Sequence, residues 1–295
     1  MAAGLARGAR AVHVLLASAA LGASGGCELV VDTMLEQCES DGDCALKGGD
    51  FANTTCREGA CRRPVGVRGA DWACLGRQPA ASKPEVAVDL KLVSLQEGAP
   101  VVAATVKACS RFDFNCVTPV RPATTTDGEG RARLLVPTDG PPLGAGFSGY
   151  LMIEAPGYLS VVRTFSRPLV DDLSELALIN LLDGIERVAT LVGASQDPAL
   201  GTLLVINNDC QGRPVANATV SASEGDTALQ FYYTVDGLPV VGATSTDGGG
   251  QALLFNAPAR SFVVRVSNEG VGQTAEFSVS VRAGALTVVG VLPDP

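Results

Sequence analysis

The 295-residue sequence contains one histidine, His13, which lies in an apolar stretch near the amino terminus. Imidazole serves as the general base for serine and cysteine nucleophiles and as a ligand of most catalytic zinc, copper and non-haem iron sites. If the amino-terminal stretch is removed on export, as predicted below, the remaining chain has no histidine. We therefore expect a protein that is not an enzyme and has no catalytic residues, no metal ion and no cofactor.

Basic residues are also few, with 22 Lys and Arg against 31 Asp and Glu and a formal net charge of −9. They are scattered along the chain, whereas a protein that binds nucleic acid presents them as a cluster or stripe. After the leader, no apolar run approaches the roughly 20 residues that a membrane-spanning helix needs. The sequence therefore predicts no nucleic-acid binding and no transmembrane helix after the leader.

Hydrophobic residues are abundant, at 46% of the chain, and are accompanied by 34 glycines and 17 prolines. Short valine-rich segments separated by turn-forming residues are typical of strands joined by tight turns. The length allows about two domains. We predict a mainly β protein with sizeable apolar cores.

The amino terminus has the pattern of an export signal. Met1–Arg10 carries two arginines and no acid, residues 11–23 are apolar, and Ser-Gly-Gly-Cys27 follows. The small residues before Cys27 resemble the bacterial lipobox, in which the cysteine thiol receives a diacylglycerol and a peptidase cuts before it. The resemblance implies a signal peptide over residues 1–26 and a lipid anchor on Cys27. It places the protein in the cell envelope, in the outer membrane or at the cell surface; ordinary cleavage would instead leave it periplasmic or secreted.

The sequence has nine cysteines, so a lipid on Cys27 would leave eight, which can all pair. Four lie in a polar stretch that we predict to be a disulfide-rich module over residues 27–63, because it has too few apolar groups to fold by burial alone. Their spacing does not suit zinc, and it resembles small cysteine-rich modules of secreted proteins such as the dickkopf-like knots. Of three possible pairings we favour the crossed one, Cys38–Cys56 with Cys44–Cys61.

The other four cysteines lie farther along the chain. Cys109 and Cys116 are close in sequence and could close one loop, which would leave Cys74 for Cys210. The second pair would tie a linker, residues 64–84, to the carboxyl-terminal half. This is one of the 105 pairings that eight cysteines allow.

An internal repeat organises the rest of the chain. Residues 98–106 (GAPVVAATV) match residues 212–220 (GRPVANATV), and residues 126–134 (TDGEGRARL) match residues 246–254 (TDGGGQALL). The two blocks lie farther apart in the second copy, which predicts an insertion within residues 228–237. In both copies Asp-Gly, followed by a second glycine and alternating apolar residues, is the signature of a hairpin turn.

A short helix is predicted between the copies, over residues 183–193. Asp183 can cap its start, Glu186 can complete a capping box, and Gly193 can end it. We expect this helix to join the two copies and to pack against one of them.

The order of these motifs, followed in the first copy by Ala155-Pro-Gly-Tyr158, resembles the carboxypeptidase regulatory-like family. The resemblance implies two tandem transthyretin-like or Ig-like β-sandwiches, over residues 85–182 and 194–295, which are non-catalytic. Together with the leader and the cysteine-rich module, the layout resembles surface lipoproteins of myxobacteria and related δ-proteobacteria.

Two sets of residues are candidates for a site. Asp127 and Asp247 occupy equivalent places, as in an aspartic protease, but each belongs to a turn of its own domain and proton sharing requires close approach. The consecutive aromatics Phe231, Tyr232 and Tyr233 could contact a sugar ring, although packing in a core is the commoner use of such residues. The sequence therefore favours a non-enzymatic envelope lipoprotein that acts as a structural or adhesion module with an envelope protein or polysaccharide as partner. The alternatives are a carbohydrate-binding module for envelope or extracellular polysaccharide and a histidine-free hydrolase.

Overall fold

The protein is mainly β. The computed structural model describes Cys38, Ser40, Asp43, residues 55–57 and 60–62, Cys74, and residues 80–138, 145–224, 227–268 and 273–291. The predicted signal peptide, the lipid site Cys27, the cysteine Cys44 and most of the cysteine-rich module and linker lie outside these residues. Among the described residues, no helix is long and apolar enough to cross a membrane.

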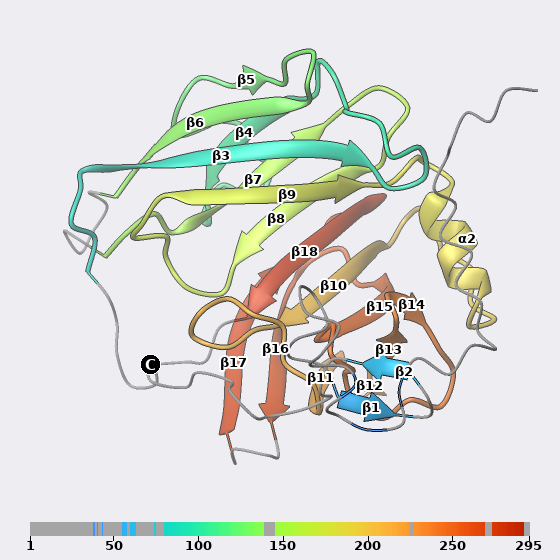
Figure 1. The fold of residues 1–295 in the computed structure, drawn as a ribbon. Helices are drawn as coiled ribbons and strands as arrows, with labels where there is room; N and C mark the ends of the chain where they lie inside the picture. The colour runs from blue at the N-terminus through green and yellow to red at the C-terminus, as the bar shows by residue number, and fades with distance from the viewer. Residues whose placement is uncertain are drawn as a thin grey trace, which may run out of the picture.

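The first half of the described chain forms two groups of strands (Figure 1). A three-stranded sheet has the order β6-β3-β9, with β3 paired antiparallel to β6 and parallel to β9. A second group has the order β8-β7-β4-β5. The strands are β3 (Glu85–Ser94), β4 (Thr105–Ser110), β5 (Thr124–Thr125), β6 (Arg131–Pro137), β7 (Gly149–Glu154), β8 (Ser160–Phe165) and β9 (Leu173–Ile179).

The second half repeats this pairing. β10 pairs antiparallel with β15 and parallel with β18, as β3 does with β6 and β9. A four-stranded sheet has the order β12-β11-β16-β17, which corresponds to β5-β4-β7-β8. The strands are β10 (Gly201–Asn207), β11 (Ala218–Glu224), β12 (Thr227–Ala228), β15 (Gln251–Ala257), β16 (Ser261–Asn268), β17 (Gln273–Ser280) and β18 (Ala285–Val291).

The second half also has an extra hairpin, which overlaps the region, residues 228–237, where the sequence predicts an insertion. Strands β13 (Tyr232–Val235) and β14 (Leu238–Pro239) pair with each other, and β13 adds to the edge of β15. Asp236 and Gly237 form the turn with φ values of 53° and 83°. Positive φ at both central residues is the geometry of a type I′ turn, which suits the twist of a hairpin.

The two halves share one sheet. β18 pairs in parallel with β10 of its own half and with β8 of the first half, so the strands run β14-β13-β15-β10-β18-β8-β7-β4-β5 without interruption (Figure 1). The sequence predicts two tandem sandwiches joined by a short helix. It does not predict that an edge strand of one half is hydrogen-bonded to an edge strand of the other, as β18 and β8 are.

The two smaller sheets cover opposite faces of this shared sheet. Successive residues of a strand point to opposite faces. Leu204 and Leu253 pack on the core of the first half, whereas their neighbours Leu203 and Leu254 belong to the core of the second half. The shared sheet therefore contributes to both cores.

Helix α2 (Gly184–Thr190) lies between the halves, within the predicted range. Ile185 and Ala189 are buried in the first core, as expected for a helix that packs on one half. The predicted capping box is wrong: Asp183 makes no side-chain capping hydrogen bond and pairs with Arg187, while Glu186 accepts a hydrogen bond from the Gln196 amide at 2.8 Å. These carboxylates interact with side chains and with the following loop rather than with the first helical turn.

Three disulfides join described residues: Cys38–Cys56, Cys109–Cys116 and Cys74–Cys210. They coincide with three of the four pairs that the sequence suggests. Cys56 lies in a small hairpin of β1 (Thr55–Arg57) and β2 (Ala60–Arg62), opposite Cys61. Because Cys44 lies outside the described residues, its bond to Cys61 stays a prediction.

Candidate functional site

The motif that is duplicated in sequence has the same structural role in both halves. The buried hydroxyl of Thr126 accepts a hydrogen bond from the Ala104 amide and donates one to the Val101 carbonyl. In the second half, Thr246 makes the same bonds with the amide of Ala218 and the carbonyl of Val215. The G-x-P-V and T-D-G-x-G segments match in both copies because they are hydrogen-bonded to each other.

The paired aspartates brace these turns and show no sign of acting together. Asp127 accepts hydrogen bonds from the amides of Glu129 and Arg131 at 2.9 and 2.8 Å, and these bonds hold the pKa of its carboxyl below the ordinary value. Asp247 accepts hydrogen bonds from the amides of Gly249 and Asp236 at 2.8 and 3.0 Å. Each carboxylate is thus occupied by the backbone of its own half.

The aromatic segment contributes to packing in both cores. Tyr233 is buried in the second core, and its hydroxyl is hydrogen-bonded to the backbone of Val220. Tyr232 packs on the first core with its ring 5.7 Å from that of Phe255, and Phe231 packs on the second core. Phe231 and Tyr233 thus share one face and Tyr232 lies on the other, as strand alternation predicts, and contact of these residues with a sugar stays a prediction.

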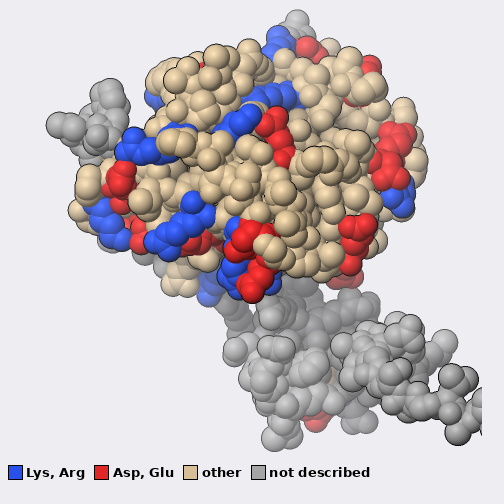
Figure 2. Space-filling model, turned by 90° about the horizontal axis from the view of Figure 1, so that it is seen from above, with Lys and Arg blue, Asp and Glu red and all other residues tan. Residues whose placement is uncertain are grey.

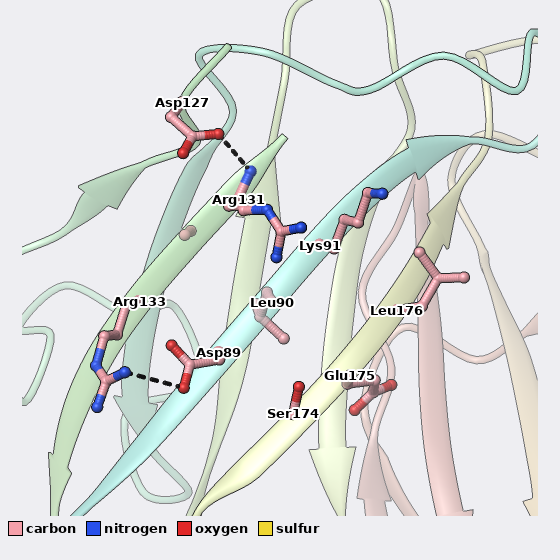
Figure 3. Close-up of a pocket in the computed structure, with 10 residues that line it drawn as sticks. Asp89, Leu90, Lys91, Asp127, Arg131, Arg133, Ser174, Glu175 and Leu176 are labelled. Carbon is pink, nitrogen blue, oxygen red and sulfur yellow. Dashed lines mark hydrogen bonds and ion pairs between the residues drawn. The ribbon is translucent and has the colours of Figure 1, made fainter. Parts of the chain in front are cut away.

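A charged depression of about 650 Å³ lies on the outer face of the three-stranded sheet (Figure 3). Lys91 of β3 and Arg131 of β6 lie side by side there, and Arg133 pairs with Asp89 at 3.3 Å. Leu176 of β9 is 60% exposed at its edge. Basic and acidic side chains are likewise interspersed on the face seen in Figure 2. The depression therefore does not present charge of one sign to a ligand.

The equivalent face of the second half has apolar residues at the same positions. In the three-stranded sheet of the first half, Asp89 of β3 lies opposite Arg133 of β6 on one side and Ser174 of β9 on the other. The matching row in the second half is Leu253, Leu204 and Val288, which pack on the first core. The charged face in the first half is therefore a solvent-facing end surface, and the apolar face in the second half is an internal one.

A contact between the halves is built around one arginine. Arg282, in the turn between β17 and β18, donates hydrogen bonds to the carbonyl oxygen of Phe114 and to the hydroxyl of Tyr150. Phe114 lies in the loop closed by Cys109–Cys116. Burial raises the pKa of the Tyr150 phenol. This contact, which we call the Arg282 contact, fixes the turn of one half against a disulfide-closed loop of the other.

The same loop is braced by Asp113. Its carboxylate accepts hydrogen bonds from the amides of Thr118 and Val117 at 2.8 and 3.0 Å, and these bonds lower its pKa. In the described part of the chain, no three His, Cys, Asp or Glu side chains are placed to hold a metal ion.

No family model matches this chain. No curated protein matches it either. Solved structures with detectable similarity include the TIE protein of Bacillus anthracis, at 12% identity over 72% of this chain and a TM-score of 0.23. The chain spans about a third of the length of that protein, 34%. The shaft pilin spaA of Lactobacillus rhamnosus GG is 10% identical over 72% of this chain and 98% of its own, with a TM-score of 0.23.

An intradiol-type enzyme also has detectable similarity. The 3-chlorocatechol 1,2-dioxygenase of Rhodococcus opacus 1CP is 16% identical over 39% of this chain and 69% of its own, with a TM-score of 0.24. TM-scores of this size do not support transfer of a function from the pilin or from the dioxygenase.

Proposed function

We propose that this protein is a non-enzymatic, exported structural or adhesion module that is attached to the cell envelope through a lipid on Cys27. The observation that carries the proposal is the shared sheet, in which β18 is hydrogen-bonded on both sides by strands of different halves. A body of this kind holds its surfaces in fixed relative positions, which is what a spacer or adhesion module requires.

Two further connections support the rigidity of this body. The Cys74–Cys210 bond joins residues that are 136 positions apart in the sequence. The Arg282 contact adds hydrogen bonds and ring contacts, with the Arg282 guanidinium 5.1 Å from the ring centre of Tyr150 and 5.4 Å from that of Phe114. Sheet pairing, a covalent bond and a polar contact thus act at three separate places.

The disulfides support export. Such bonds form and persist in oxidising compartments and are rare in the cytosol. Three are present among the described residues. Attachment through Cys27 rests on the resemblance of the leader to a lipobox. No observation favours the carbohydrate-binding alternative over this proposal: Tyr233 is buried, and Phe231 and Tyr232 are partly buried on opposite faces.

Mass spectrometry of the protein extracted from its native membranes tests the anchor. The expected amino terminus is Cys27 carrying diacylglycerol, and Cys27→Ala should move the protein from the membrane fraction to the soluble fraction. An unmodified Cys27 in the mature protein, or a Cys27→Ala variant that stays in the membrane fraction, would refute the anchor.

Distances between spin labels test the rigid body. Labels introduced through non-natural amino acids at Arg133 and Thr274 report on the two halves without adding thiols. Both side chains are exposed. One narrow distance distribution is expected, and a broad or two-peaked distribution would contradict a fixed arrangement.

A further inference from the structure

A groove of about 410 Å³ lies where the two halves meet on the face of the shared sheet that carries the second core. Its floor includes Tyr150 of β7 and Thr164 of β8, and one wall is the strand β17. Arg111 and Arg167 are among the other residues of the first half that line it. The groove therefore depends on both halves and lies away from the charged depression.

The wall formed by β17 is an open strand edge. Among the described strands, β17 is the last of its sheet and pairs with β16 alone. The consecutive residues Glu276, Phe277 and Ser278 all line the groove. Because consecutive side chains point to opposite faces of a sheet, a groove that touches all three runs along the edge of the strand. Unpaired backbone donors and acceptors of an edge strand are a template for one more strand.

The opposite wall has positive charge without a partner. Neither Arg111 nor Arg167 has an ion pair among the described residues, and the one acidic side chain of the groove, Glu276, is paired with Arg265. The Nη1 atom of Arg167 is buried and has no hydrogen-bond acceptor within the described part of the chain. Burial also lowers the pKa of this guanidinium. An unsatisfied buried donor is costly, and a turn of the guanidinium toward the groove would let a carboxylate accept hydrogen bonds from both ends of the fork and remove that cost.

We propose that this groove binds an extended peptide segment that adds to the edge of β17 and places an acidic side chain on Arg167. Backbone pairing with β17 supplies affinity, and the carboxylate supplies selectivity, as in other cases of strand addition. A peptide fits better than a saccharide because the edge offers amide and carbonyl groups at strand spacing. The exposed ring at the rim, Phe112, already has the Arg111 guanidinium 4.7 Å from its ring centre, so one of its faces is taken by a cation.

Binding of a labelled peptide tests the proposal. The probe is fluorescein-labelled Thr-Val-Glu-Val-Thr with blocked ends, measured by fluorescence anisotropy against the mature full chain at low salt. Arg167→Gln should weaken binding by about tenfold, because a charge-assisted pair is lost. The same loss is expected when Gln replaces Glu in the peptide. Hydrogen exchange of residues 273–280 should slow when the unsubstituted peptide is added.

Two further variants make the result interpretable. Arg133→Gln is the matched control, since Arg133 is exposed on the charged depression and should leave the affinity within twofold of that of the unchanged protein. Arg111→Gln, at an exposed rim position, should weaken binding even if Arg167→Gln fails to fold.

Several results would overturn the proposal. The first is the absence of binding at millimolar peptide concentration. The second is an affinity for the peptide that is the same in the unchanged protein and in every groove arginine variant that folds. The third is slowed hydrogen exchange in segments other than β17. Displacement of the peptide by oligogalacturonate that itself binds more tightly would assign the groove to an acidic polysaccharide instead. The proposal does not depend on the lipid anchor, so an unmodified Cys27 would leave it standing.

Discussion

Among the described residues, the aspartates Asp113, Asp127 and Asp172 have carboxyl groups whose pKa values are lowered in the folded protein. Asp113 and Asp127 accept hydrogen bonds from backbone amides, and Asp172 accepts them from the Lys83 ammonium at 2.9 Å and from the Ala87 amide. A carboxylate with a lowered folded pKa binds protons more readily after unfolding. Its contribution to stability is therefore present above the unfolded pKa, near 4, and is lost as the pH falls through the folded value.

This predicts a loss of thermal stability on the acid side. The midpoint of unfolding should fall as the pH is lowered from about 5 to 2, and Asp127→Asn should lower the midpoint at pH 7 and flatten the acid dependence. Asp171→Asn is the control, because Asp171 makes no hydrogen bond within the described ranges. Circular dichroism melts at each pH measure the midpoints; identical acid profiles for the unchanged protein and for Asp127→Asn would contradict the assignment.

A buried hydroxyl gives a second prediction for a single residue. Thr287 in β18 has no exposed surface, and its Oγ1 has no hydrogen-bond partner in the described structure. Valine has nearly the same shape and no polar atom to desolvate. Thr287→Val should therefore raise the free energy of unfolding by about 1 kcal/mol in urea titrations. A destabilised variant would show that the hydroxyl has a partner in solution.

The matched turns of the two halves allow a prediction at the scale of elements. Gly130 and Gly250 have φ values of 75° and 66°, and an added Cβ would lie 2.5 Å from the carbonyl oxygens of Leu92 and Asn207 respectively. Alanine at either position should cost about 2 kcal/mol or more. Gly128→Ala and Gly248→Ala are the controls, because nothing lies within 4 Å of an added Cβ there.

Urea denaturation of the four variants measures these costs. Equal losses at positions 130 and 250 would support the equivalence of the two turns. A loss at one of them alone would mean that the turns differ in spite of their sequence match.

The elements that the sequence could predict are those specified by local chemistry. The duplicated turns and the strand-rich character follow from glycine, aspartate and alternating apolar residues, and the insertion follows from the wider spacing of the two repeat blocks in the second copy. The joint between β18 and β8 could not be predicted from local signals, because pairing between distant strands has no motif. One signal was available: β18 reads ALTVVGV without a charged residue, which is typical of a strand buried on both faces.

The candidate site was less predictable than the fold. Consecutive aromatics in a strand alternate between its faces, so Tyr232 and Tyr233 pack in different cores, and sequence spacing cannot say that both faces are buried. The groove beside β17 combines Arg167 from one half with Glu276 and Ser278 from the other. Such a combination appears only once the halves are placed side by side.

At the scale of the whole molecule, the disulfide that closes the longest loop should contribute most to the free energy of unfolding. Cys74–Cys210 closes a sequence separation of 136, against 7 for Cys109–Cys116. Replacing Cys74 and Cys210 together by alanine should lower the free energy of unfolding by about 2–4 kcal/mol, because the unfolded chain gains more freedom. The double variant at Cys109 and Cys116 should lose less. Urea titration under non-reducing conditions compares the two; a larger loss at the short loop would contradict this ranking.

The equivalent sheet faces of the two halves differ in a way that limits further stacking. The outer face of the first three-stranded sheet presents the charged pair Asp89 and Arg133, where the second half has Leu204 and Leu253. A charged outer face is the pattern of a terminal, capping unit in a stacked array. We therefore expect the joint between β18 and β8 to be made once within the chain and not to be repeated between copies.

The shared sheet makes the two halves one cooperative body, and differential scanning calorimetry of the disulfide-intact protein tests this most directly. We expect one transition whose van't Hoff and calorimetric enthalpies agree. Two separable transitions, one for each half, would show that pairing of β18 with β8 does not couple them and would contradict the rigid module proposed for this protein.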